Sequence, residues 1–289
     1  MCIRDRPDAF VSYASPTFSM VEPLARMNGM EAQAVPWAEA LADPGTLLEG
    51  GPAVVYVCRP NNPTGEVAPR AWFEALLKRA GLVPDAGAPG VGAPRPLVVL
   101  DEAYADFAED SWITLGARVP NLLVARTASK AYGLAGLRCG FGVATPETAV
   151  EIEKSRGPYK VARLAAEAVA AAVRDQEEGL PGIVAEARNN RARLHAALEA
   201  RGLDPIPSQA NFILFRAPSG DAYHDMVSIR LEGVGVRPFR EIAGMGEGLR
   251  VTVGPLETVE RFLAALDAAF PELPGTTGDR HPSSRTTDA

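Results

Sequence analysis

Short apolar runs rich in valine and leucine alternate along the chain with segments of helical periodicity. This alternation is typical of an α/β fold with a mostly parallel sheet. The runs predict strands at 53–58, 97–100, 122–125 and 139–144. A helix is predicted from Pro69 to Ala80, because proline suits a first helical turn and Gly81 can end the helix.

The pattern changes after Pro158. Helices are predicted at 161–176 and 183–201, strands at 212–215, 235–239 and 249–253, and an amphipathic helix at 256–270. We therefore expect a large domain over 7–158 and a smaller α/β domain over 159–271. A loop rich in proline, glycine and alanine is predicted at 84–96, and a disordered tail at 272–289.

Composition and charge narrow the classes of function. The formal net charge is −7 and no run of basic residues occurs, so nucleic acid is not expected as a partner. Cys2, Cys58 and Cys139 lie far apart, without the spacing of metal ligands, and no metal site is expected. No apolar stretch approaches the roughly 18 residues of a membrane span, and no signal peptide is visible. We expect a cytoplasmic protein that is neither secreted nor membrane-bound.

Three polar residues follow predicted strands: Asn62 after the first, Asp101 after the second and Lys130 after the third. Ligands of open parallel sheets bind outside the carboxyl ends of the strands, so these side chains are expected to converge. Pyridoxal phosphate (PLP) requires such a set: a lysine for covalent attachment, a carboxylate for its ring nitrogen, and donors for its phosphate and phenolic oxygen.

Three motifs carry a resemblance to a known family. They are Asn-Asn-Pro-Thr-Gly at 61–65, Asp-Glu-Ala-Tyr at 101–104, and Arg-Thr-Ala-Ser-Lys-Ala-Tyr-Gly-Leu-Ala-Gly-Leu-Arg at 126–138. In sequence and order they resemble the cofactor motifs of fold-type I aminotransferases. The resemblance implies that Lys130 attaches the cofactor covalently and shuttles the proton at the substrate Cα. It implies that Asp101 pairs with the ring nitrogen, and that Asn62 and Tyr104 bond the phenolic oxygen.

The same resemblance implies the remaining cofactor contacts. Thr127, Ser129 and Arg138 would hold the phosphate, for which arginine supplies a forked donor that is always charged. Phe18 is similar to the aromatic residue that stacks on the cofactor ring.

Further segments resemble histidinol-phosphate aminotransferases over most of 11–270: those at 16–20, 157–161, 210–212, 236–239 and 249–254. By this resemblance Arg250 receives the carboxylate of glutamate, and Arg250 with Arg237 receives the phosphate of the phosphorylated imidazole substrate. The family also implies a homodimer, so a homodimer is expected.

The chain departs from the family in some places. Family members carry an additional N-terminal segment with a Gly-rich turn, so we expect the chain to lack the N-terminal part of its large domain; residues 1–6 resemble nothing in the family. Arg59, Lys160 and Ala162 stand where the family often has other residues.

Alternative functions stay open at this point. They are an aromatic amino-acid aminotransferase, a PLP lyase similar to threonine-phosphate decarboxylase, and an inactive fragment. Individual residues also have structural interpretations. Asn62 and its neighbours form a common turn sequence, Arg237 and Arg250 could make surface ion pairs, and Phe18 could belong to the core. The glycines at 244, 246 and 248 predict a flexible loop, and no catalytic or metal role is expected for His195, His224 or His281.

Overall fold

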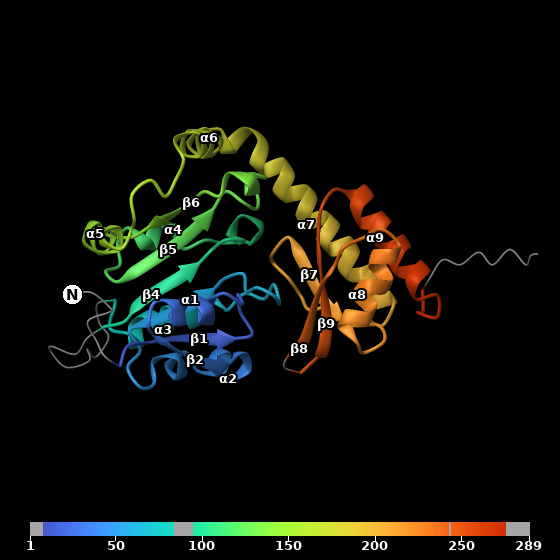
Figure 1. Cartoon of the computed structure of the whole chain (residues 1–289), viewed down its shortest axis with the longest axis horizontal. Helices are drawn as coiled ribbons and strands as arrows, with labels where there is room; N and C mark the ends of the chain where they lie inside the picture. Colours follow the sequence, from blue (N-terminus) through green and yellow to red (C-terminus); the bar gives the residue numbers. More distant parts are fainter. Residues whose placement is uncertain (1–7, 84–94, 243, 276–289) are drawn as a thin grey trace, which may run out of the picture.

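The computed structural model describes residues 8–83, 95–242 and 244–275. Residues 1–6, His281, and most of the predicted loop at 84–96 and tail at 272–289 lie outside the described part. Two sheets organise the rest, one of six strands and one of three (Figure 1).

The larger sheet confirms the predicted α/β architecture. Its strand order is β2-β1-β3-β4-β5-β6, with parallel pairing from β2 to β5 and antiparallel pairing of β5 with β6. The strands are β1 (Phe10–Ser15), β2 (Glu31–Pro36), β3 (Val54–Cys58), β4 (Leu97–Asp101), β5 (Leu122–Thr127) and β6 (Gly140–Val143). The last four were predicted from the apolar runs. Strands β1 and β2 were not predicted from the sequence. β2 is mostly exposed and lacks a continuous apolar run.

Helices and short 3-10 turns connect these strands. They are α1 (Val21–Met27), α2 (Trp37–Ala42), η2 (Pro44–Leu48), α3 (Arg70–Arg79), η3 (Ala105–Phe107), α4 (Ile113–Gly116), η4 (Ala135–Leu137) and α5 (Pro146–Lys154). Helix α3 begins directly after Pro69, as predicted. Its buried residues Phe73 and Leu77 are four positions apart and therefore share one face of the helix. Both belong to the hydrophobic core that also contains buried residues of β3, β4 and β5.

The smaller sheet has its own hydrophobic core. Strands β7 (Phe212–Arg216), β8 (Arg237–Ile242) and β9 (Gly246–Thr252) pair antiparallel in the order β7-β9-β8, and α8 (Ala222–Leu231) and α9 (Leu256–Ala269) pack against them. The loop predicted around the glycines is partly wrong, because Gly246 and Gly248 lie in β9. Gly248 is placed against β7: a Cβ there would lie 3.1 Å from the carbonyl oxygen of Phe215.

Helix α7 (Gln176–Ala200) runs from the region of the larger sheet to the smaller one (Figure 1). It starts seven residues before the predicted 183, and it contains Pro181 in its exposed early turns. The preceding helix α6 (Arg163–Arg174) comes after the expected domain boundary at 158. Its buried residues Ala165 and Val169 nevertheless pack with Ala128 and Cys139, which belong to the segment between β5 and β6 of the larger sheet. The separate cores support a two-domain division, which stays a proposal. No helix within the described ranges is long and apolar enough to cross a membrane.

Candidate active site

Asp101 is the last residue of β4, so its carboxylate stands at the carboxyl edge of the parallel strands. Its Oδ1 accepts a hydrogen bond from the backbone N–H of Ala103 at 2.9 Å, and its Oδ2 accepts one from the hydroxyl of Tyr56 at 2.6 Å. Each carboxylate oxygen therefore has one protein donor. A carboxylate has about four lone-pair positions, so capacity remains for a third donor.

Lys130 lies three residues after β5 and is half-buried. Its Nζ is 5.0 Å from the ring centre of Tyr104, and the ring of Tyr104 meets Phe212 of β7 edge to face at 5.0 Å. Among the described residues, no carboxylate lies within 4.0 Å of this amine as an ion-pair partner.

Asn62, in the loop after β3 of the larger sheet, is hydrogen-bonded to Arg250 of the smaller sheet. The guanidinium of Arg250, on β9, donates to the side-chain oxygen of Asn62, and it also lies 4.8 Å from the ring centre of Phe212. Arg237 on β8 is the register partner of Arg250. Burial, and secondarily the positive charge of Arg237, lower the pKa of Arg250, while Tyr104 opposes this shift. Two neighbouring cations at one place favour an anionic ligand.

The loop that carries Asn62 is held by its neighbour Asn61. The buried Asn61 amide donates to the carbonyl oxygen of Pro16 at 2.9 Å and to the hydroxyl of Thr64 at 3.1 Å. Thr17 donates to the Asn61 side-chain oxygen at 3.0 Å. These bonds tie the segment containing Phe18 to the Asn62 loop. Phe18 itself is 38% exposed, so the core interpretation of this residue is wrong.

The expected phosphate residues follow β5. The hydroxyl of Thr127 accepts a hydrogen bond from the Ser129 backbone N–H at 3.1 Å, which makes a compact turn just before Lys130. Arg138 has a left-handed backbone, with φ of 50°. Its exposed side chain donates to the carbonyl oxygen of Ala135 at 3.1 Å. The structure thus brings Thr127 and Ser129 together, whereas the described hydrogen bond of Arg138 is directed to its own turn.

A buried ion-pair network behind the site was missed by the sequence analysis. Glu102 is fully buried and accepts hydrogen bonds from the Trp112 backbone N–H at 2.7 Å, the Ser111 hydroxyl at 2.6 Å and the Arg126 guanidinium at 3.0 Å. Arg126 also pairs with Asp106. Burial raises the pKa of Asp106, and Arg126 opposes this shift. The network connects β4 and β5 to the η3 turn. Motif position alone gives no signal for it, because the partners are 9 to 24 residues apart.

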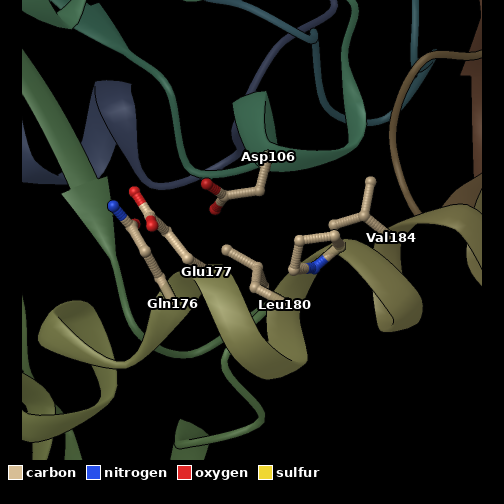
Figure 2. Close-up of a pocket in the computed structure, with 6 residues that line it drawn as sticks. Asp106, Gln176, Glu177, Leu180 and Val184 are labelled. Atoms are coloured by element: carbon tan, nitrogen blue, oxygen red, sulfur yellow. The ribbon is translucent and has the colours of Figure 1, made fainter.

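A hollow lies beside this network, between η3 and the first turns of α7. Figure 2 shows the carboxylate of Asp106 turned toward Gln176 and Glu177, with Leu180 and Val184 further along the helix. The hollow is lined by the carboxylates of Asp106 and Glu177 and by apolar side chains. Such a lining would repel an anionic ligand, whether a phosphate or a carboxylate. Lys130 and Asp101 do not line this hollow, and we do not assign the reaction to it.

The donor set at the carboxyl edge fits PLP. The loops after the strands supply the groups that the cofactor requires. They are the carboxylate of Asp101, the amine of Lys130, the amide of Asn62, the phenol of Tyr104 and the hydroxyls of Thr127 and Ser129. Within the described residues, no group of three or more His, Cys, Asp or Glu side chains is arranged to hold a metal ion. Cys58 and Cys139 are both free and buried.

Comparisons with known proteins agree with this fit. The family model for aminotransferase class I and II matches residues 1–266. The chain is 38% identical over 273 residues to a histidinol-phosphate aminotransferase of Symbiobacterium thermophilum, covering 92% of this chain and 71% of that protein. It is 37% identical over 279 residues to an aromatic amino acid aminotransferase of Streptomyces coelicolor, with the same coverage.

A crystal structure gives the same result. The histidinol-phosphate aminotransferase of Sinorhizobium meliloti, in complex with pyridoxal-5'-phosphate, superposes with a TM-score of 0.72 at 27% identity, covering 91% of this chain and 71% of that one. The chain therefore belongs to the class I and II aminotransferase family. It is a PLP-dependent aminotransferase with the fold-type I architecture.

Proposed function

We propose that this enzyme transfers an amino group between L-glutamate and imidazole-acetol phosphate, with 2-oxoglutarate and histidinol phosphate as products, and so acts in histidine biosynthesis. The observation that carries the proposal is the pairing of Arg237 with Arg250 on neighbouring strands, beside Asn62 and Tyr104. Glutamate carries two carboxylates and imidazole-acetol phosphate carries a phosphate, and two arginines provide matching forked donors for these groups.

PLP, when bound, supplies an electron sink for the bonds at the substrate Cα. In our proposal Lys130 holds the cofactor covalently, and its freed amine moves the proton at Cα. The carboxylate of Asp101 holds a proton on the ring nitrogen. Asn62 and Tyr104 orient the ring by donating to its phenolic oxygen. The 5.0 Å approach of the Lys130 Nζ to the Tyr104 ring supports the grouping of these two residues.

The remaining cofactor contacts are proposed from the loop after β5. Thr127 and Ser129 donate hydroxyl hydrogen bonds to the phosphate, and Arg138 joins them by turning from the Ala135 carbonyl. The half-exposed Phe18 covers one face of the ring, since its segment is tied to the Asn62 loop through Thr17.

For the substrates, we propose that Arg250 binds the carboxylate of glutamate. The bond that the Arg250 guanidinium donates to Asn62 supports this role, because Asn62 is proposed to orient the cofactor ring. Arg237, adjacent in register, joins Arg250 on the phosphate of the imidazole substrate. The two substrates then occupy the same place in alternate half-reactions.

A second candidate is transfer to aromatic 2-oxo acids. The similarity to the aromatic amino acid aminotransferase of Streptomyces coelicolor, at 37% identity, favours it nearly as much. Phe212 and Phe239, both near the Arg250 guanidinium at 4.8 and 5.8 Å, would provide apolar contacts for a ring. A lyase that releases carbon dioxide from a phosphorylated amino acid would use the same cofactor residues.

A substrate comparison tests the proposal. The purified enzyme with PLP and glutamate is assayed for 2-oxoglutarate with imidazole-acetol phosphate, phenylpyruvate and 4-hydroxyphenylpyruvate, and separately for carbon dioxide from threonine phosphate. We expect the highest kcat/KM with imidazole-acetol phosphate. A higher value with either aromatic acid, or carbon dioxide release without consumption of glutamate, would contradict it.

We further propose a cytoplasmic homodimer. Met20, Leu24 and Met27 at α1 are 41%, 47% and 76% exposed, and such apolar groups favour burial against a second copy. Sedimentation of the full chain with PLP should give twice the monomer mass of 30.6 kDa. A monomer at micromolar concentration would contradict the dimer and leave the proposed reaction to its own test.

A further inference from the structure

Tyr56 is hydrogen-bonded to Asp101, whose carboxylate is proposed to bind the ring nitrogen of the cofactor. In the pairing of β3 with β4, Cys58 is the register partner of Asp101. Tyr56 lies two residues before Cys58 and therefore on the same face of the sheet. From there its hydroxyl reaches forward and donates to Asp101 Oδ2 at 2.6 Å.

The ring of Tyr56 is fixed by packing. It contacts the cluster formed by Val11, Tyr13, Val21 and Ala25, which joins β1 to α1. The hydroxyl is thus presented from a residue in the middle of β3 that packs against this cluster. Side chains that orient a functional group are most effective when their own rotamers are locked in this way.

The phenol is also a permanent donor. Burial is the main cause of a strongly raised pKa for Tyr56, and the nearby Cys58 and Asp101 raise it further. Burial likewise raises the pKa of Cys58. The Cys58 thiol donates to the carbonyl oxygen of Pro60 at 3.3 Å. Tyr56 therefore keeps its proton at any physiological pH and directs it to Asp101.

The two hydrogen bonds of Asp101 act from different elements. The Ala103 backbone N–H donates to Oδ1 from the segment between β4 and η3, and the Tyr56 hydroxyl donates to Oδ2 from β3. Two donors on the two oxygens fix the plane of the carboxylate. Its remaining lone pairs are then aimed in one direction.

We propose that Tyr56 is a positioning residue that acts through Asp101 on the ring nitrogen of the cofactor. This inference rests on the proposed role of Asp101. Tyr56 does not touch the cofactor in this account; it sets the orientation of the carboxylate that does.

The test measures cofactor binding in place of turnover. Apoenzyme is titrated with PLP and with an analogue in which a C–H group replaces the ring nitrogen, for wild type and for Tyr56→Phe. The replacement removes one hydrogen bond to a charged group, so we expect PLP to bind about tenfold more weakly. The analogue, which gives Asp101 no partner, should bind equally well to both proteins.

Two further variants make the result specific. Tyr13→Phe removes another buried phenol of the same cluster and should leave both affinities unchanged. In an Asp101→Asn background, Tyr56→Phe should have no additional effect on PLP affinity. Equal weakening for PLP and for the analogue, or no weakening at all, would overturn the inference while the proposed function stands. Failure of wild type to retain PLP would contradict the proposed roles of Asp101 and Lys130 themselves.

Discussion

The Nζ of Lys130 lies 5.0 Å from the ring centre of Tyr104, and that ring packs edge to face on Phe212. Lys130 and Tyr104 follow strands of the larger sheet, whereas Phe212 begins the first strand of the smaller one. The candidate cofactor lysine therefore stands where the two sheets meet. In our proposal, Arg237 and Arg250 of the smaller sheet bind the substrate groups that react at this lysine.

Arg237 and Arg250 should differ in which substrate they affect. We expect Arg250→Lys to raise KM for both glutamate and the phosphorylated substrate about 10-fold or more, because a forked charged contact is lost. Arg237→Gln should raise KM about 10-fold for the phosphorylated substrate and less than about twofold for glutamate. Steady-state kinetics with each substrate varied measures both.

The matched control is Arg240→Gln, three residues further along β8. The Arg240 guanidinium lies 4.7 Å from the ring centre of Tyr223, away from Arg250's contacts. Its kinetic constants should equal those of wild type. Equal effects of Arg237→Gln on both substrates would contradict the proposed division of roles.

The Glu102 network should be important for stability. Arg126→Met would leave the fully buried Glu102 without its ion-pair partner, and we expect a loss of about 3–5 kcal/mol in the free energy of unfolding. Urea unfolding measures the loss. Arg26→Met, which breaks the exposed pair with Glu22, should cost less than about 1 kcal/mol. Similar costs for the two variants would show that the buried network contributes little.

Alkaline pH should destabilise the fold through Tyr56 and Cys58. Burial raises both pKa values above their ordinary values of 10.0 and 9.0. The folded state therefore keeps protons that the unfolded state releases. This contribution to stability is fully present below pH 9 and falls as the pH rises, by about 1.4 kcal/mol per pH unit for each group. Tyr56→Phe should give a shallower decline above pH 10; parallel curves for the two proteins would contradict this.

Gly65 is predicted to tolerate substitution worse than Gly133. Both have positive φ, +80° and +68°, so alanine is strained at either position. A Cβ on Gly65 would also lie 2.1 Å from the Ser208 Oγ and 2.5 Å from its Cβ, whereas no heavy atom lies within 4 Å of one on Gly133. We expect Gly65→Ala to cost about 1–3 kcal/mol more in urea unfolding. Equal costs would mean that the Ser208 segment moves aside freely.

Much of the fold was predictable because its central strands are largely apolar, with buried residues that alternate with partly buried ones. β3, β4 and β5 appear in the sequence as continuous apolar runs, and the positions after them hold Asn62, Asp101 and Lys130. The strand β2 was not predictable in this way. It lies at the edge of the sheet with mostly exposed residues, so burial leaves no pattern in its sequence.

The supporting contacts of the site were harder to predict. Tyr56 occurs inside an apolar strand, and only the register between β3 and β4 places its hydroxyl against Asp101. Likewise Arg250 and Asn62 are 188 positions apart and meet because two sheets pack together. Such contacts depend on tertiary geometry, which local sequence patterns do not encode.

The attachment of PLP to Lys130 is the central claim, and chemical trapping tests it most directly. The enzyme is incubated with PLP, reduced with borohydride and digested, and the modified peptide is identified by mass spectrometry. We predict a phosphopyridoxyl group on Lys130 in wild type and in Lys160→Ala, and none in Lys130→Ala, which should also lose the visible absorbance of the bound cofactor. Modification at another lysine of wild type, or full cofactor absorbance in Lys130→Ala, would contradict the account.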